Sequence, residues 1–145
     1  MKIITTNKKA HFEYFVLEEF TAGISLVGSE VKSIRSGYVS INDCYVQFRG
    51  GEAFIINMYI KNYPYTTQYE LDERRTRKLL LNKREINYLL GKVTEKGLTV
   101  IPLKLYFNQG LVKVEIALCK GKQLYDKRQT LKKRDIERDI ARELN

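Results

Sequence analysis

Residues 111–119 (LVKVEIALC) alternate between apolar side chains and a second set that includes a lysine and a glutamate. Because successive side chains of a strand point to opposite faces, this spacing predicts a half-buried β-strand. The apolar run 98–107 precedes it, and Asn108-Gln109-Gly110 between the two runs predicts a hairpin turn. An antiparallel pair at this place makes a β-rich fold the first expectation.

More strands are predicted nearer the N-terminus. Residues 12–20 (FEYFVLEEF) are aromatic and partly alternating, which predicts a strand, and Thr21-Ala22-Gly23 then predicts a turn before a short strand at 24–27. Residues 44–49 and 53–60 flank Gly50-Gly51, and a glycine pair between two such runs predicts a hairpin because tight hairpin turns need positive φ.

Helices are fewer. Residues 28–35 predict a brief helix, since Val31 and Ile34 are three positions apart. Asn82, followed by Glu85, predicts a capping box at the start of a longer helix that ends at Gly97. Its expected apolar face consists of Ile86, Leu89, Leu90 and Val93.

The pattern as a whole predicts a mainly β protein, a small antiparallel barrel with two or three peripheral helices. An oligonucleotide-binding type of barrel fits this pattern, although the pattern alone does not single it out. At 145 residues one domain is expected, over about 1–122, followed by a basic tail at 123–145. The final stretch, from residue 120, holds nine Lys+Arg and five Asp+Glu. Two interpretations of it stay open: a solvated tail, or a segment that is disordered alone and becomes helical against a polyanion.

The composition favours binding over catalysis. The formal net charge of +9 indicates a polyanionic partner. No apolar run is long enough to span a membrane, and the N-terminus lacks a secretory signal, so no membrane partner and a cytoplasmic location are expected. Two cysteines and one histidine show no metal-ligand spacing, and phosphate-binding glycine motifs are absent. We therefore expect no catalytic residue, no metal and no cofactor.

Three basic clusters point towards RNA: Asn7-Lys8-Lys9, Arg74–Lys78 and the tail. Tyr63, Tyr65 and Tyr69 could stack on bases, although most of the ten tyrosines are expected in the core or on sheet faces. A solubilising loop would explain any one cluster taken alone. An enzyme alternative, a nuclease or RNA-modifying enzyme, would use Glu70, Asp72 and Glu73 with a metal, but acids interleaved with bases usually form a self-neutralising loop.

Several blocks resemble the small protein B family, the partner of transfer-messenger RNA in bacterial ribosome rescue. The most specific are EVKSIRSG (30–37), RTRKLLLN (75–82) and GK-x-x-YDKR (121–128), and the matching segments run in family order from residue 7 to about 135. The resemblance implies an oligonucleotide-binding-like barrel. One face of the barrel would bind the transfer-RNA-like domain of transfer-messenger RNA. The RNA-binding residues that the resemblance implies are Asn7, Lys8, Lys9, Arg77, Lys78, Leu80, Asn82, Lys113 and Lys122.

The resemblance also implies a second partner, the ribosome. The tail would occupy the decoding centre of the small subunit and the empty messenger path, and elongation factor Tu would join indirectly through the aminoacylated RNA. The residues implied at the decoding region are Phe12, Tyr125, Asp126, Lys127, Arg128, Lys132, Lys133, Arg134 and Arg138. The alternative within the binding class is a generic structured-RNA or ribosomal protein.

Two positions depart from the family pattern. Thr21 stands where a glutamate is common, so a contact made by that carboxylate would be lost or replaced by a hydroxyl. Phe12 stands where some relatives have histidine, and its ring can stack but cannot titrate.

Overall fold

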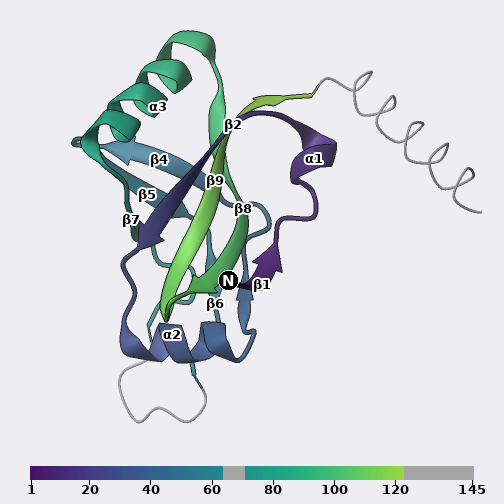
Figure 1. Cartoon of the computed structure of the whole chain (residues 1–145), viewed down its shortest axis with the longest axis vertical. Coiled ribbons are helices and arrows are strands. Elements are labelled where there is room, and N and C mark those ends of the chain that lie inside the picture. The colour runs from purple at the N-terminus through teal and green to yellow at the C-terminus, as the bar shows by residue number, and fades with distance from the viewer. Residues whose placement is uncertain (64–70, 123–145) are drawn as a thin grey trace, which may run out of the picture.

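The computed structural model describes residues 1–63 and 71–122 (Figure 1). In chain order the described elements are β1 (Lys2–Thr6), α1 (Ala10–Glu13), β2 (Tyr14–Ile24), α2 (Gly28–Arg35), β3 (Val39–Ser40), β4 (Tyr45–Arg49), β5 (Glu52–Ile56), β6 (Tyr59–Ile60), β7 (Arg77–Leu80), α3 (Lys83–Lys96), β8 (Thr99–Asn108) and β9 (Leu111–Gly121).

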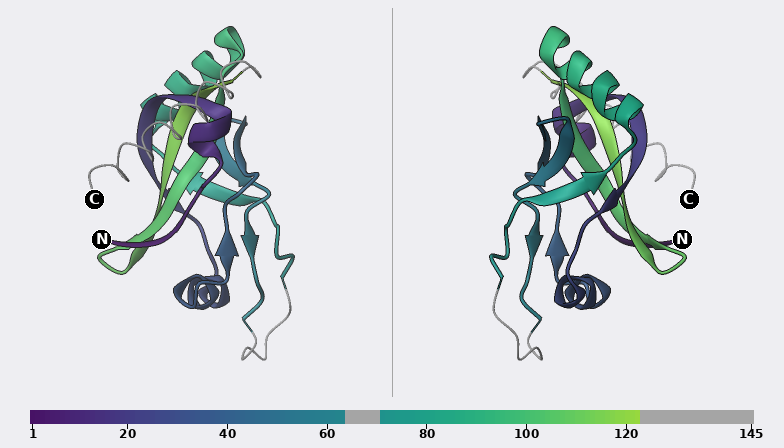
Figure 2. Two further views of the ribbon diagram at one scale, coloured as in Figure 1. Left: turned by 90° about the vertical axis from the view of Figure 1, so that its right-hand side faces the viewer. Right: turned by 90° about the vertical axis from the view of Figure 1, so that its left-hand side faces the viewer.

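Seven strands form one antiparallel sheet in the order β1-β8-β9-β2-β7-β5-β4. The strands β3 and β6 pair separately. The sheet curls so that β4 lies against β8, but among the described residues no ladder joins the edge strands β1 and β4. The prediction of a mainly β, barrel-like fold with peripheral helices is confirmed, with the qualification that the barrel is not closed. The helices α2 and α3 lie at opposite ends of the sheet (Figures 1 and 2).

The alternation in β9 sorts its side chains as predicted. Val114 and Ile116 are fully buried in the main core, together with Ile55 of β5 and Leu79 of β7. Helix α3 adds Leu89 to the same core, and complete burial of one such side chain contributes roughly 1.5–3 kcal/mol. The opposite face of the sheet carries a smaller apolar cluster near one end, consisting of Ala10, Ile101, Ala117 and Cys119. Elsewhere that face is available for other contacts.

Turns and caps follow the local sequence closely. Gly50 and Gly51, with φ of 58° and 77°, connect β4 to β5, and Gly110, with φ of 78°, completes the β8–β9 turn. Helix α3 has the expected capping box, and Gly97 ends it in the left-handed conformation. One prediction for this helix was wrong: Leu90, expected on the apolar face, is 39% exposed.

The strand predictions need three corrections. Residues 21–23 form no turn, because β2 continues through them and pairs with β9 and β7 at Gly23. Phe12 lies in α1 rather than in a strand. The strands β1 and β7 were not predicted: β1 is only five residues long, and β7 begins inside a run of basic residues.

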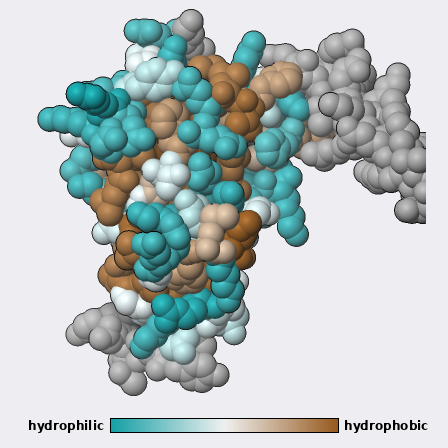
Figure 3. Space-filling model, viewed as in Figure 1, coloured by the Kyte–Doolittle hydropathy of each residue, from teal (hydrophilic) through white to brown (hydrophobic). Residues whose placement is uncertain are grey.

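The surface is mixed in polarity. On the side seen in Figure 3, hydrophobic residues are separated by hydrophilic ones rather than joined in one large patch. Among the helices of the described residues, none has the length and apolar character needed to cross a membrane.

Candidate nucleic-acid interface

Strand pairing aligns three of the discussed residues across the outer face of the sheet, the face opposite the main core. Gly23 of β2 pairs with Lys113 of β9 on one side and with Leu80 of β7 on the other. Partners in register present their side chains to the same face, and so does Lys78, two residues before Leu80. Lys113, Leu80 and Lys78 therefore share one surface, which we call the outer row together with Gly23.

Leu80 is held outward in this row. Its side chain is 54% exposed, although the sequence pattern around it, Leu79-Leu80-Leu81, resembles a buried run. Gly23 permits the position, since a Cβ on residue 23 would lie 3.2 Å from the Cβ of Leu80. An exposed apolar side chain flanked by lysines provides a surface on which an unpaired base can stack while phosphates meet the ammonium groups.

The lysine of β7 has a partner within the protein. The Lys78 Nζ lies 2.8 Å from Glu52 Oε1, and the two side chains are 44% and 47% exposed. Exposed pairs of this kind are weak, so Lys78 stays available to a phosphate, provided that it gives up or shares Glu52. Next to the pair, the Arg49 guanidinium lies 5.2 Å from the centre of the Phe54 ring, and Phe54 is the cross-strand partner of Lys78.

Arg77 corrects a prediction, because it points into the core instead of towards a phosphate. Its side chain is 1% exposed, its Nε donates to Glu30 Oε2 at 2.7 Å, and an Nη donates to the Met58 carbonyl at 2.7 Å. Arg75 Nε donates to the same Glu30 oxygen at 3.0 Å. A direct RNA contact by Arg77 is therefore incompatible with this arrangement; the residue joins β7 to α2.

The buried carboxylate responds to these partners. Burial alone would raise the pKa of Glu30, but hydrogen bonds from Arg75, the Val27 N–H and Arg77 outweigh it and leave the pKa below its ordinary value of 4.5. Burial lowers the pKa of the Arg77 guanidinium, against the stabilising pull of Glu30. The pair stays charged, and its role is structural.

The N-terminal cluster Asn7-Lys8-Lys9 also contains one residue that is engaged within the protein and two that are accessible. Asn7 is engaged within the chain, because its side-chain amide donates to the Pro102 carbonyl at 3.0 Å and its Oδ1 accepts from the Lys9 N–H at 3.3 Å. Lys8 is exposed, and Lys9 forms a loose, exposed ion pair with Asp43 at 3.8 Å. The two lysines are thus the accessible members of this cluster.

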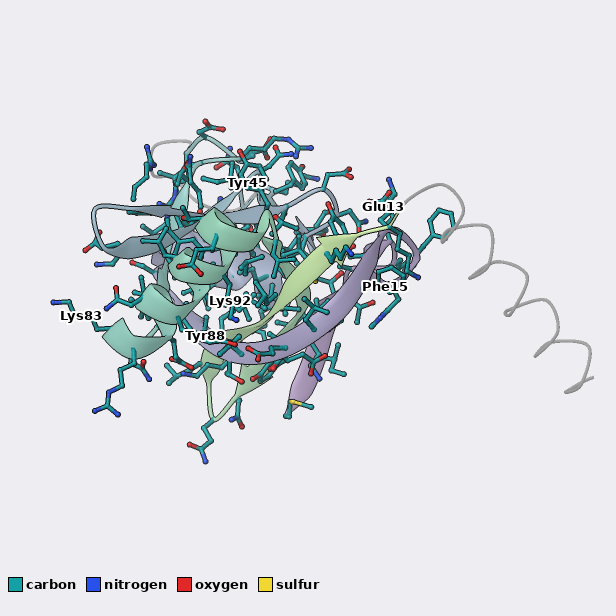
Figure 4. All side chains as sticks on the ribbon, turned by 90° about the horizontal axis from the view of Figure 1, so that it is seen from above. Glu13, Phe15, Tyr45, Lys83, Tyr88 and Lys92 are labelled. Atoms are coloured by element: carbon teal, nitrogen blue, oxygen red, sulfur yellow. The ribbon has the colours of Figure 1, made fainter. Side chains whose placement is uncertain are left out.

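Asn82 and Lys122 also have structural partners. The Asn82 side chain accepts from the Glu85 N–H at 2.9 Å and caps α3. The Lys122 Nζ donates to the His11 carbonyl at 2.8 Å and lies 5.0 Å from the centre of the Phe15 ring. Figure 4 shows Phe15 and the first residue of α3, Lys83, on opposite sides of the molecule. Lys122 and α1, which includes Phe12, therefore lie apart from the capped start of α3.

The acidic segment does not form a metal site in the part of the chain that the structure describes. Asp72 Oδ1 accepts from the Arg74 N–H at 2.9 Å, and Glu73 Oε2 accepts from the Asn62 N–H at 2.8 Å, so both carboxylates organise a turn. No group of three or more metal-ligating residues occurs among the described residues. Burial raises the pKa of the Cys44 and Cys119 thiols to about 12, which leaves them unreactive at neutral pH.

Other expected residues lie outside the described ranges. These are Tyr65, Tyr69 and Glu70, and in the tail Tyr125, Asp126, Lys127, Arg128, Lys132, Lys133, Arg134 and Arg138.

Two features of the outer face were not predicted from the sequence. Glu52 neutralises Lys78 in part, and Glu115 of β9 accepts a hydrogen bond from the Thr21 hydroxyl at 3.1 Å. In the structure, Thr21 of β2 pairs with Glu115 of β9. This pairing was not predicted because residues 21–23 were expected to form a turn.

Comparison with known sequences assigns the chain to a family. A family described as "SmpB protein" matches residues 4–145. The chain belongs to the SmpB family. Its relatives include an SsrA-binding protein of Acholeplasma laidlawii (strain PG-8A), 56% identical over 144 residues, which covers 99% of this chain and 97% of the relative. Another is the SsrA-binding protein of Gloeothece citriformis (strain PCC 7424), 54% identical over 142 residues, covering 97% and 92%.

A solved SmpB-family structure has the same fold. It comes from the work "tmRNA-SmpB: a journey to the center of the bacterial ribosome", and it matches with a TM-score of 0.69 and 45% sequence identity, covering 83% of this chain and 85% of that one. The resemblance seen in residues 30–37, 75–82 and 121–128 is thus confirmed at the level of the family.

Proposed function

We propose that this chain is an RNA-binding factor of trans-translation. Its outer row binds the transfer-RNA-like domain of transfer-messenger RNA, and the protein helps deliver that RNA to stalled ribosomes, where the incomplete protein is tagged. The observation that carries the proposal is the row itself: an exposed leucine held between Lys113 and Lys78 by the close approach at Gly23. The SsrA-binding relatives and the tmRNA-SmpB structure support it.

The surface residues that we assign to the RNA are those the structure leaves accessible. Lys113, Lys78 and Lys8 meet phosphates, which gives affinity without sequence choice, and Leu80 stacks on an unpaired base. Lys9 extends the basic surface. Asn7, Asn82 and Arg77 act through the fold, by anchoring β1, capping α3 and fixing β7.

Residues 123–145 serve the ribosome in this proposal, as a second functional part beside the body at 1–122. Their basic residues, with Phe12, enter the decoding centre and the messenger path in place of a codon–anticodon helix. The protein itself carries out no chemistry, since peptide transfer belongs to the ribosome. Elongation factor Tu takes part through the aminoacylated RNA, and the site of action is the bacterial cytoplasm.

Deletion of residues 126–145 tests this division of labour. The strands and helices of the described body lie within residues 2–121, so the shortened chain keeps them. We expect it to bind transfer-messenger RNA with unchanged affinity in a filter-binding assay and to support no tagging in a reconstituted translation reaction. An equal loss of affinity and tagging would refute the division. If ribosomal RNA fragments bound as tightly as transfer-messenger RNA, a generic RNA-binding protein would be the better description.

A further inference from the structure

Glu115 is a carboxylate on the basic outer face that phosphate binding does not explain. Glu115 follows Lys113 by two residues on β9 and therefore shares its face, and its cross-strand partner on β8 is Lys104. A negative charge at this place repels the RNA backbone. Glu52, on the same sheet face, has an evident role as the partner of Lys78. Among the described ion pairs, none includes Glu115.

The carboxylate of Glu115 is nevertheless fixed in direction. The Thr21 hydroxyl donates to its Oε2 at 3.1 Å across the β2–β9 pair. An ionised carboxylate has about four lone-pair positions on two oxygens, so this one hydrogen bond leaves Oε1 and part of Oε2 unused. This hydrogen bond is exposed to solvent, so the remaining lone pairs of the oriented carboxylate face water and can accept hydrogen bonds from a ligand in its place.

Glu115 lines a cavity of about 390 Å³ on this face, a size in the range of small-molecule sites. Lys8 and Lys104 also line it, and so do Leu103 and His11, an apolar and an aromatic residue of the kinds on which a base can stack. The cavity contains a second carboxylate, that of Glu19. The lining is charge-balanced, with two lysines and two glutamates. This combination suits a whole nucleotide, because the carboxylates accept from the N–H donors of a neutral base while the lysines meet its phosphate.

We propose that this cavity binds an unpaired guanine of the bound RNA and that Glu115, oriented by Thr21, accepts hydrogen bonds from its Watson–Crick edge. Guanine is the base whose edge presents two N–H donors side by side, N1–H and the N2 amino group, which match the two carboxylate oxygens. Adenine and cytosine place an acceptor nitrogen beside their amino group, and that nitrogen repels the second oxygen. This inference rests on the proposed function and names the base that the RNA-binding face selects.

Two matched substitutions on one face give opposite predictions. With a transcript of the transfer-RNA-like domain of transfer-messenger RNA as probe, Glu115→Gln is expected to weaken binding about tenfold, the size of one good side-chain–base contact. Glu52→Gln removes the same charge but frees Lys78, so it is expected to strengthen binding by a few-fold at low salt. Thr21→Val, which removes only the orienting hydrogen bond, is expected to weaken binding less than Glu115→Gln.

A second arm of the experiment changes the RNA instead of the protein. Inosine lacks the N2 amino group, so replacing the bound guanosine with inosine is expected to weaken binding by the wild type and to have no further effect on Glu115→Gln. Scanning the unpaired guanosines of the transcript one at a time identifies the position.

Binding by Glu115→Gln that equals or exceeds the wild type would overturn the inference, because it would show that Glu115 only repels the RNA. The inference is also overturned if no inosine substitution distinguishes the two proteins. Either result leaves the proposed function intact as long as the wild type prefers this transcript over a transfer RNA of similar length. Loss of that preference would overturn the proposed function and this inference with it.

Discussion

The two faces of β7 use adjacent basic residues in opposite ways. Arg77 is 1% exposed and pairs with Glu30 of α2, whereas Lys78 is about half exposed and pairs with Glu52 on the surface. Both residues belong to one basic cluster in the sequence, and both have an acidic partner. Strand alternation alone sends one inward and the other outward.

Formal charge alone therefore does not identify an RNA contact. If Arg77 left Glu30, a charge would remain buried without a partner. Because that costs several kcal/mol, Arg77 stays paired with Glu30 and cannot turn to a phosphate. An exposed ammonium exchanges one oxygen partner for another with little loss of free energy, which is what phosphate binding requires. Arg77 therefore determines where β7 lies, and Lys78 and Leu80 use that position.

Substitutions on the two faces of β7 should differ most in the free energy of unfolding. Arg77→Met removes one partner of a buried ion pair and is expected to lower the free energy of unfolding by roughly 3–5 kcal/mol. Lys78→Met, the matched control one residue away, is expected to change it by less than about 1 kcal/mol. Urea unfolding followed by circular dichroism measures both. Similar losses in the two variants would show that the faces of β7 are not distinct.

The next prediction separates two kinds of RNA contact within the outer row, base stacking and phosphate binding. Leu80→Ala is expected to weaken binding of the transfer-RNA-like domain by roughly tenfold through lost stacking, with no change in salt dependence. Lys113→Ala is expected to weaken binding and to reduce the slope of log affinity against log salt by about one, the signature of a single phosphate contact. Filter binding between roughly 50 and 200 mM salt, the range over which such contacts are resolved, measures both slopes. Identical slopes for Lys113→Ala and wild type would exclude a phosphate contact.

Acid pH is expected to weaken the inner face. The pKa of Glu30 is depressed in the folded protein, so on acidification the unfolded chain takes up this proton first. The contribution of Glu30 to stability is therefore complete above its ordinary pKa of 4.5 and is lost as the pH falls through the lower folded value, by about 1.4 kcal/mol for each unit of depression. Glu30→Gln should be less stable at pH 7 and should lose less on acidification. Parallel stability curves for the two proteins would contradict this assignment.

The smallest expected effect concerns the close approach under Leu80. A Cβ at residue 23 would lie 3.2 Å from that of Leu80, so Gly23→Ala must displace the leucine by a few tenths of an ångström. We expect a two- to threefold loss of RNA affinity, about 0.5 kcal/mol, with the fold retained. The same substitution in Leu80→Ala protein should weaken binding less, because the displaced side chain is shorter. A full, additive loss in the double variant would show that Gly23 acts independently of Leu80.

Sequence patterns predicted the parts of the fold that local chemistry decides. The alternation at 111–119, the glycine turns and the Asn82–Glu85 capping box all correspond to observed elements. The continuity of β2 was missed because Thr21-Ala22-Gly23 resembles a turn locally, while its conformation is decided by two neighbouring strands that are distant in sequence. Tertiary pairing overrode the local preference.

For the candidate site, the sequence predicted most of the residues but not how they are arranged. Lys78, Leu80 and Lys113 were named from the family resemblance, and the register places them on one surface. Arg77 could not be assigned correctly, since its inward position depends on a partner, Glu30, that is 47 residues away in the sequence. Glu115 was missed because a carboxylate is not expected on a surface selected for its positive charge.

The most direct test of the outer row is to ask which RNA it selects from a cell. Wild-type protein and a Leu80→Ala/Lys113→Ala double variant would each be used to pull down RNA from a bacterial lysate, and the bound RNA would be sequenced. We expect transfer-messenger RNA to dominate the wild-type sample and to be strongly depleted from the variant sample, while both proteins show the same circular dichroism spectrum. A spread of ribosomal fragments with the wild type, or equal recovery of transfer-messenger RNA by both proteins, would contradict this expectation.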